Sequence, residues 1–295
     1  MKSRQPLLVY IAIAYFISWL IFILLALNHH HIIFLFQDDA AHARLQDVVH
    51  SIGGLGPISA AIITFRLFHQ KGELHQFVSR YSFKKLTLKG WLLAFSPLLI
   101  FVFSLLVSRI ITHNWFDISG YFEKNKLVKT SNLFAWFLPI VFYGFGEEGG
   151  WRGYALPALQ SNCAAFKATV ILSVIWICWH IPSFFYRYDF KGGAYLGFLL
   201  GIFAGAIWLT FLFNYTNGSI LAVSLWHLTF NFASMIGKDD IVLSAVMSIA
   251  VMLLACFVLI KYKFESLSPV KKSTLHTGIP RSKVLMTTQF PHYKR

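Results

Sequence analysis

The chain has 295 residues, of which 57% are hydrophobic and only 13% are charged. An ordinary soluble domain carries about 25% charged residues, so this composition excludes that class. The formal net charge of +14 could indicate nucleic acid as a partner. The basic residues, however, are grouped in the connections between apolar stretches, which indicates membrane lipid as the partner and no nucleic acid.

Eight apolar stretches are about as long as the roughly 20 residues that cross a bilayer as a helix. In chain order they are residues 6–27, 51–68, 90–112, 132–156, 166–185, 194–213, 219–236 and 241–260. The first follows Lys2 and Arg4 as in a signal peptide, but it is too long and has no clear small-residue cleavage site. We therefore predict an all-α polytopic membrane protein with about eight transmembrane helices, the first of them retained.

Basic residues are concentrated in alternate connections. They gather before the first stretch, in residues 69–89 and from Lys261 onward, whereas residues 28–50 carry three aspartates and one arginine. Because cytoplasmic connections carry an excess of Lys and Arg, we predict a multi-pass protein of the cell membrane with both termini in the cytoplasm. The segment 113–131, with three lysines, fits this topology least well.

The predicted helices form one membrane domain, residues 1–264. Beyond it, residues 265–295 lose the apolar pattern and are rich in Pro, Ser, Thr and Lys, which predicts a basic, disordered cytoplasmic tail. Glycines recur every four residues at Gly193, Gly197, Gly201 and Gly205. Such a stripe is typical of a helix that a neighbouring backbone approaches closely, and a groove that admits a substrate is the alternative.

The segment GFGEEGGWRGY (144–154) places charge inside a predicted helix. Of the 12 acidic residues, only Glu147 and Glu148 fall within a predicted span, where a charged side chain costs about 2.5–3.5 kcal/mol. In a helix, Glu148 and Arg152 stand at i and i+4 and can pair, while Glu147 points about 100° away, into a cavity. Glu147 is then the carboxylate available for proton transfer. The alternative is that Pro139 and the glycines break the helix and leave both glutamates near water.

Two further apolar spans carry polar side chains. His180 lies in VIWICWHIPSFF one turn after Trp176, and His227 and Asn231 stand at i and i+4 in NGSILAVSLWHLTFNFAS. A lone histidine in such a span is often a hydrogen-bonded packing residue. Because three helices each supply polar groups that need partners inside hydrocarbon, we predict that these groups converge on one polar cavity in the bundle.

Three short motifs in this order resemble those of a known family. EEGGWR, from Glu147 to Arg152, resembles the EExxxR motif of the CAAX-protease and bacteriocin-processing (CPBP, or Abi) family of intramembrane proteases. The segment from Trp176 to His180 is similar to the FxxxH motif of that family, with tryptophan where phenylalanine is usual, and HLTFN is similar to its HxxxN/D motif. The resemblance covers about residues 130–235.

This resemblance implies an intramembrane endopeptidase that hydrolyses peptide bonds of membrane-associated substrates, among them prenylated proteins and bacteriocin precursors. The residues that match the motifs are implied in three roles: activation of water by Glu147 and His180, stabilisation of the oxyanion by His227 and Asn231, and support by Glu148, Arg152 and Trp176. Two other classes stay open. One is a non-catalytic bacteriocin-immunity or partner-binding membrane protein of the same fold, and the other is a transporter.

The same side chains leave the role of a metal open. Two histidines and a glutamate are a known ligand set for zinc with a free fourth position, so Glu147, His180 and His227 could bind Zn²⁺. Direct activation of water by the carboxylate and the imidazole is the other possibility. Asn231 favours the direct route, because an amide is a better hydrogen-bond donor to an oxyanion than a metal ligand.

The expected depths of the polar residues conflict at one position. At 1.5 Å per residue, Glu147 lies roughly 22 Å from the outer end of its span, and His227 and Asn231 lie roughly 12–18 Å from the cytoplasmic end of theirs. These depths agree with each other. His180, counted from Ala165, lies roughly 22 Å from the cytoplasmic side. Either residues 155–166 dip into the membrane or the predicted boundary is wrong.

Overall fold

The computed structural model describes residues 5–36, 40–188 and 192–275. Within these ranges the regular secondary structure is helical, with no β-strand. Six stretches there are long and apolar enough to cross a membrane, and a bent helix pair makes a seventh if it counts as one span. They are Gln5–His29, His42–Phe68, Ala165–Phe185, Tyr195–Tyr215, Ile220–Gly237 and Ile241–Lys261, with Leu88–Ala94 and Ser96–Thr112 as the pair. The predicted all-α polytopic membrane fold is confirmed, while the number of eight spans stays a prediction.

Three helices open the fold and pack along one another. They are α1 (Gln5–His29), α2 (Ala40–Gly53) and α3 (Gly56–Phe68). The prediction of a loop over residues 28–50 is wrong from Ala40 onward, because α2 begins there. One of its polar side chains, His50, has partners inside the molecule: it is buried, stacks on the ring of Phe22 and hydrogen-bonds the Tyr186 hydroxyl.

The next part of the chain contains a bent pair of helices. Its elements are α4 (Lys71–Ser79), the 3-10 turn η1 (Phe83–Lys85), α5 (Leu88–Ala94), α6 (Ser96–Thr112) and α7 (Ile118–Lys124). The axes of α5 and α6 differ by 48°. Pro97 lies in the first turn of α6, where its ring is tolerated but cannot continue the hydrogen-bond ladder of α5. The single helix predicted over residues 90–112 is therefore two.

Residues 130–160 form one continuous helical run of changing type. The run consists of α8 (Thr130–Phe142), the π-helical turn η2 (Tyr143–Glu147), α9 (Glu148–Gly150), the π-helical turn η3 (Trp151–Ala155) and α10 (Leu156–Gln160). Its glycines permit close contact with the α2–α3 segment: a Cβ on Gly146 would lie 2.4 Å from the Gly54 carbonyl oxygen, and one on Gly150 would lie 2.4 Å from the carbonyl carbon of Pro57. The glycines therefore do not end the helix at the glutamates. They let widened turns, which are frequent at functional sites, pack against a neighbouring backbone.

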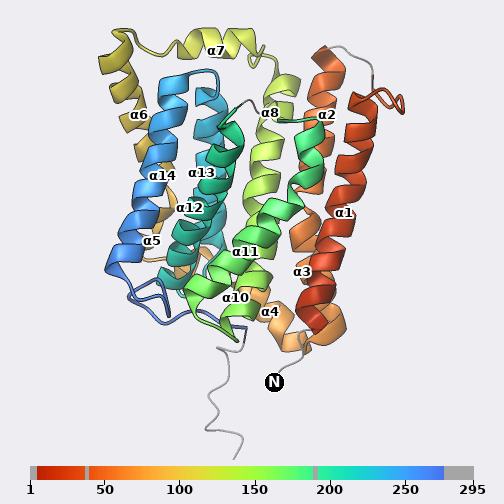
Figure 1. Ribbon diagram of the computed structural model, residues 1–295, viewed down its shortest axis with the longest axis vertical. Coiled ribbons are helices and arrows are strands. Elements are labelled where there is room, and N and C mark those ends of the chain that lie inside the picture. The colour runs from red at the N-terminus through yellow and green to blue at the C-terminus, as the bar shows by residue number, and fades with distance from the viewer. Residues whose placement is uncertain (1–4, 37–39, 189–191, 276–295) are drawn as a thin grey trace, which may run out of the picture.

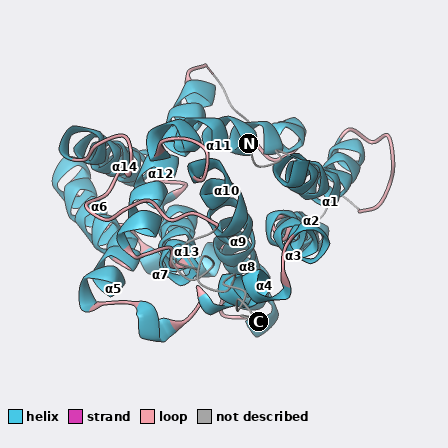
Figure 2. Ribbon diagram, turned by 90° about the horizontal axis from the view of Figure 1, so that it is seen from below, coloured by secondary structure: helices cyan, strands magenta, loops and turns pink. Residues whose placement is uncertain are grey.

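Four long helices complete the bundle. They are α11 (Ala165–Trp179), which continues into the 3-10 turn η4 (Ile181–Phe185), then α12 (Ala194–Tyr215), α13 (Ile220–Gly237) and α14 (Ile241–Lys261). α1 begins and α14 ends at the same end of the bundle, the lower one in Figure 1. Seen along the bundle axis, α9 and α13 lie near the middle, α1 lies toward one edge, and α6 and α14 lie toward the opposite edge (Figure 2). The segment that carries the two glutamates is thus surrounded by other helices.

The glycine stripe of α12 does not serve close packing against the described helices. A Cβ added at Gly193, Gly197, Gly201 or Gly205 would meet no atom within 4 Å. A packed neighbouring helix would approach closer than that, so the packing interpretation is wrong for the part of the chain that the structure describes. The stripe instead leaves open space along α12.

Residues 262–275, which we call the C-terminal strap, fold back across one end of the bundle. The carbonyl groups of Phe264 and Glu265 accept hydrogen bonds of 3.0 Å from the N–H groups of Phe166 and Ala165, the first amides of α11. These amides have no partner within their own helix, so the strap acts as their cap. The strap differs from the disordered tail that we predicted from residue 265 onward, and residues 276–295 lie outside the described ranges.

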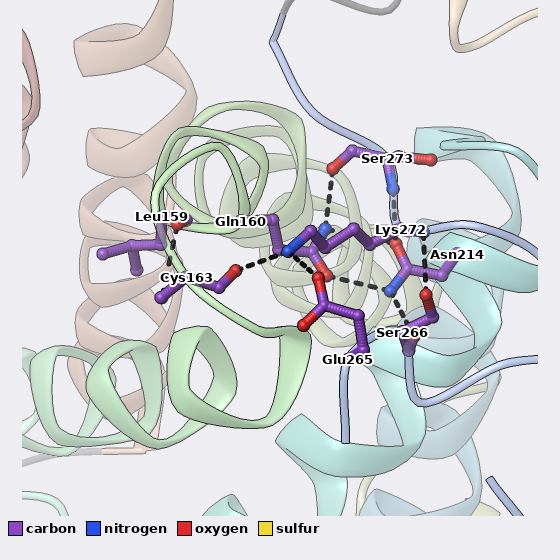
Figure 3. A network of polar contacts seen from close by, with 8 residues as sticks. All are labelled: Leu159, Gln160, Cys163, Asn214, Glu265, Ser266, Lys272 and Ser273. Atoms are coloured by element: carbon purple, nitrogen blue, oxygen red, sulfur yellow. Dashed lines mark hydrogen bonds and ion pairs between the residues drawn. The ribbon is translucent and has the colours of Figure 1, made fainter. Parts of the chain in front are cut away.

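A buried pair of amide side chains fastens the strap. Asn214 at the end of α12 and Gln160 at the end of α10 exchange hydrogen bonds of 2.9 and 3.1 Å (Figure 3). Asn214 also donates to the Ser266 carbonyl oxygen at 2.8 Å and accepts from the Ser273 N–H at 3.0 Å. Gln160 donates to the Ser273 carbonyl oxygen at 2.7 Å. Two helix ends and the strap therefore share one hydrogen-bond network.

Candidate active site

The two glutamates lie on the central helical run and are removed from solvent. Glu147 ends η2 and Glu148 begins α9. Glu147 is 3% exposed, and both Glu148 and Arg152 are 0% exposed. Burying a charge is costly unless it is paired and hydrogen-bonded, so the partners of each carboxylate decide what it can do.

Glu148 joins three elements through one oxygen. Its Oε1 accepts a hydrogen bond of 2.8 Å from Arg152 Nη1 and another of 2.8 Å from His227 Nδ1. The predicted pair at i and i+4 is therefore present, even though the intervening turn is π-helical in part. The bond to His227 was not expected from the sequence. It connects α9 and η3 to α13.

Glu147 has a different set of partners. Its Oε2 accepts hydrogen bonds from two indoles, Trp176 Nε1 at 2.5 Å and Trp151 Nε1 at 3.4 Å. Its Oε1 has no hydrogen-bond partner among the described residues, and it is not fully enclosed by the protein. The carboxylate is thus held through one oxygen, and the other keeps some accessible surface where it can bind water or accept a proton.

His180 follows the last turn of α11 and lies beside Trp176, with 6.1 Å between the ring centroids. Its Nδ1 lies 2.8 Å from the Trp176 carbonyl oxygen. A carbonyl can only accept, so Nδ1 carries the proton and Nε2 of the neutral ring presents a lone pair. The rings of Trp179 and Phe198 stand edge-on to His180, at 4.8 and 5.4 Å between centroids, and hold the imidazole in place.

The carboxylate of Glu148 determines which nitrogen of His227 carries a proton, as the Trp176 carbonyl does for His180. Paired with Arg152, it is an acceptor only, so Nδ1 of His227 is the donor. In a neutral ring Nε2 would then be an acceptor, and it becomes a donor only when the ring is doubly protonated. The negative charge of Glu148 behind the ring stabilises this imidazolium. His227 can therefore serve an oxyanion only in its charged form.

Asn231 stands one turn beyond His227 on α13 and is half-buried. Its spacing places it on the same face of the helix as His227. Hydrogen bonds to Trp176 or Glu148 bring the other predicted site residues together: Glu147, Arg152, His180 and His227. Asn231 is related to these residues only by its position on the same face of α13 as His227.

The three residues considered as zinc ligands each offer an atom of a suitable type: Glu147 Oε1, His180 Nε2 and His227 Nε2. Among the residues that the structure describes, however, no three His, Cys, Asp or Glu side chains lie close enough together to hold one metal ion. These side chains as placed do not form a zinc site. Zinc binding by this set stays a prediction.

The course of α11 accounts for the depth conflict at His180. In Figure 1, α11 is inclined to its neighbours, so it rises by less than 1.5 Å per residue along the bundle axis. Its last turn reaches Glu147 directly through the Trp176 indole. Residues 157–160, which the predicted boundaries placed between two spans, are helical and belong to α10.

Trp151 is a site residue that the sequence motifs did not single out. It lies at i+4 from Glu147 and donates to the same carboxylate oxygen as Trp176. It is fully buried, and its ring stands edge-on to Tyr10 of α1 and Trp179 of α11, at 6.0 and 5.9 Å between centroids. Its spacing from an intramembrane carboxylate is the signal that could reveal it, because side chains at i and i+4 share a helix face.

Comparisons with known proteins concern the segment that carries this site. Residues 129–233 match the family described as type II CAAX prenyl endopeptidase Rce1-like. A protein named CAAX prenyl protease 2 from Methanococcus maripaludis is 33% identical over 106 residues, which are 32% of this chain and 39% of that protein. The match therefore covers less than half of the length of this relative. Both findings support the family expected from the three motifs, and every site residue named above lies inside the matched segment.

Proposed function

Since the segment that carries the site is related to the CAAX prenyl endopeptidases, we propose that this integral membrane protein is an endopeptidase in which Glu147 and His180 activate the attacking water. One observation carries the proposal. The Glu147 carboxylate is buried and held by two indole N–H groups at Oε2, which leaves Oε1 as the basic atom. The imidazole of His180, fixed against Trp176, presents the lone pair of Nε2.

The reaction needs one proton to move twice. Glu147 Oε1 takes a proton from water as the water oxygen attacks the carbonyl carbon of the scissile peptide, while His180 Nε2 accepts a hydrogen bond from the same water. The carbonyl oxygen becomes negative in the tetrahedral intermediate. When the C–N bond breaks, protonated Glu147 returns the proton to the leaving amine. The carboxylate is thereby restored.

Two residues of α13 stabilise the oxyanion by hydrogen bonds. The imidazolium Nε2–H of His227 and the side-chain amide of Asn231 are the donors, and loss of one such donor costs about 2.7–4 kcal/mol of barrier. Glu148 supports this role because it accepts from Nδ1 and balances the positive ring. Arg152 also pairs with Glu148. The buried site then holds two cations, Arg152 and the His227 imidazolium, against two carboxylates.

The substrate class follows from the setting of the site. The catalytic groups lie inside a bundle of apolar helices, so a peptide bond must be presented at or within the membrane. A prenylated C-terminal peptide is the first candidate, because the matched relative is named for such substrates. Bacteriocin precursors are the second. The distribution of basic residues supports a location in the cell membrane with both termini in the cytoplasm.

Cleavage by the purified protein tests the proposal. We expect the wild-type protein, in detergent or in lipid nanodiscs, to cleave a farnesylated CAAX peptide or a bacteriocin leader peptide. Glu147→Ala and His180→Ala should abolish cleavage while the folded protein remains in the membrane. Glu123→Ala is the control, because Glu123 is exposed on α7, away from the site.

Three outcomes would contradict the proposal. Cleavage by Glu147→Ala at nearly the wild-type rate would remove Glu147 from the reaction. An immunity phenotype that survives Glu147→Ala would indicate a non-catalytic partner-binding protein of the same fold. Loss of solute uptake in Glu147→Gln, without any cleavage by the wild type, would indicate a transporter.

A further inference from the structure

We infer that Trp176 is a positioning residue of this site: its indole N–H holds one oxygen of Glu147 and thereby presents the other oxygen to the attacking water. The inference rests on the proposed function, because it assigns a role in the same reaction. The motif usually has phenylalanine at this position, and a phenylalanine has no donor. Trp176 of this chain therefore supplies a donor that phenylalanine lacks.

Trp176 contacts each of the groups that surround the site. Its N–H donates to Glu147 Oε2, and its carbonyl oxygen accepts from His180 Nδ1. The Arg152 guanidinium carbon lies 4.7 Å from the centroid of the Trp176 ring. The ring of His227 stands edge-on to the same indole, at 5.9 Å between centroids. Trp176 thus contacts all four of these side chains: Glu147, His180, Arg152 and His227.

The bond between Trp176 and Glu147 is shielded from solvent. It is 2.5 Å long, and the two residues are 7% and 3% exposed. An indole has one N–H donor and no acceptor, so the carboxylate oxygen must be the acceptor. Hydrogen bonds to an ionised acceptor are roughly twice as strong as neutral ones. This bond therefore fixes the rotation of the Glu147 carboxylate about its terminal bond.

The second indole does not replace the first. Trp151 Nε1 reaches the same oxygen at 3.4 Å, beyond the usual range for an N–H donor. Without the Trp176 donor, the carboxylate can adopt other angles about its terminal bond, whose rotation is only weakly restricted. The free oxygen then loses its fixed direction toward the water. A misplaced base slows the chemical step and leaves substrate binding nearly unchanged.

A purely structural role of Trp176 can be separated from this positioning role. A phenylalanine at position 176 keeps an aromatic ring against Arg152 and His227. It also keeps the backbone carbonyl that orients His180, because that acceptor belongs to the main chain. Trp176→Phe thus removes the donor to Glu147, together with the indole volume that a phenyl ring does not fill.

The kinetic test compares Trp176→Phe with a matched control, Trp208→Phe. Trp208 of α12 is also a buried indole, 3% exposed, but its Nε1 has no hydrogen-bond partner within the described residues. We expect Trp176→Phe to lower kcat by about 10–100-fold, with KM within about twofold of the wild type. Trp208→Phe should leave both constants within about twofold of the wild-type values. Thermal unfolding of both variants shows that they are folded.

A spectroscopic test does not depend on turnover. In protein with ¹⁵N-labelled tryptophan, the indole N–H signal of Trp176 is the one that disappears in Trp176→Phe. We expect this signal to shift in Glu147→Gln, because its acceptor loses the negative charge. In Glu123→Gln, which removes an exposed charge on α7, the signal should stay in place.

The outcomes separate this inference from the proposed function. An unchanged kcat in Trp176→Phe, or a rise in KM alone, would overturn the positioning role while cleavage by the wild type still supports the endopeptidase. If the chemical shift of the Trp176 indole N–H is the same in Glu147→Gln as in the wild type, the hydrogen bond itself is contradicted. Absence of cleavage by both the wild type and Trp208→Phe would refute the proposed function and the positioning role with it. The indole signal would then still decide whether the bond exists.

Discussion

Arg152 is a fully buried cation whose charge is balanced within one helical turn. Its Nη1 donates to Glu148, while its Nε and Nη2 have no hydrogen-bond partner among the residues that the structure describes. Its guanidinium carbon lies over the Trp176 ring, 4.7 Å from the ring centroid. The ion pair with Glu148 is therefore the main reason why this charge is tolerated inside the bundle.

We expect Arg152→Ala to reduce both stability and activity. The change leaves the charge of Glu148 buried with His227 as its remaining donor, and breaking a buried pair costs about 3–5 kcal/mol. The midpoint of thermal unfolding in detergent should fall clearly below that of the wild type, and peptide cleavage should fall with it. Arg187→Ala is the control, because the Arg187–Asp47 pair is 28% and 53% exposed and such pairs contribute about 0–1 kcal/mol. Equal midpoints for Arg152→Ala and the wild type would contradict this expectation.

At the scale of single residues, the sequence could indicate which side chains belong to the site but not which of their atoms form hydrogen bonds. The i, i+4 spacing predicted the Glu148–Arg152 pair, which the structure contains. It could not show that His227, 79 positions away, donates to the same carboxylate oxygen. Nor could it show which nitrogen of each histidine is anchored, since this depends on acceptors that come from other turns and helices. These contacts arise only when three helices are placed side by side.

Glycine in the central helical run is required by the approach of another backbone. A Cβ on Gly150 would lie 2.3 Å from the Cβ of Pro57 and 2.6 Å from its carbonyl oxygen. Neither of these atoms can move without moving the start of α3. Close approach between α9 and α3, rather than flexibility, is the reason for glycine at this position.

We predict that Gly150→Ala and Gly201→Ala have opposite effects on stability. Gly150→Ala should prevent folding or lower the unfolding midpoint strongly, because the added carbon overlaps with Pro57. Gly201→Ala adds a carbon that meets nothing within 4 Å, in the interior of α12, where alanine is favoured over glycine by about 0.8–1 kcal/mol. Its midpoint should equal or exceed that of the wild type. The yield of folded protein by gel filtration and the midpoint in detergent measure both effects, and a wild-type midpoint for Gly150→Ala would show that α3 can move away.

The elements could be predicted wherever the physical signal is local. Long apolar stretches predicted most of the helices, because a span needs little more than length and hydrophobicity. α2 was missed because its polar side chains, His50 among them, have partners on other elements. The strap was missed because its bonds use backbone groups, and composition does not show where those groups lie.

We expect Asn214→Ala to loosen the C-terminal strap. The change leaves the Ser266 carbonyl, the Ser273 N–H and the Gln160 amide without their buried partner, at about 1–3 kcal/mol for each unsatisfied group. The unfolding midpoint should fall, and trypsin should cut more rapidly after Lys272. Asn162→Ala is the control, because Asn162 is exposed and its side chain bonds only the Ala158 carbonyl in its own turn. Equal rates of cleavage for Asn214→Ala and Asn162→Ala would show that the strap is held by other contacts.

For the molecule as a whole, the response to chelators decides between two chemistries. If Glu147, His180 and His227 bind zinc, a chelator should stop turnover and added zinc should restore it. We expect little or partial sensitivity, because these side chains do not converge on one point within the described residues. Asn231→Ala should lower the rate without changing any bound metal, because the amide acts as a donor. Stoichiometric zinc that is lost and regained together with activity would contradict the expectation.

The strap also has a consequence for how the protein is made. Residues 262–275 leave the ribosome after all the helices that they cover, so α11 is inserted while its first amides still lack the carbonyls of Phe264 and Glu265. Gln160 and Asn214, at the ends of α10 and α12, likewise lack the carbonyl groups of the strap until it has been synthesised. Membrane insertion and the closing of this end are thus separate events in time. A nascent chain arrested before residue 262 would leave the first amides of α11 uncapped and the Gln160–Asn214 pair uncovered, so this end of the bundle would stay open to water until the strap is made.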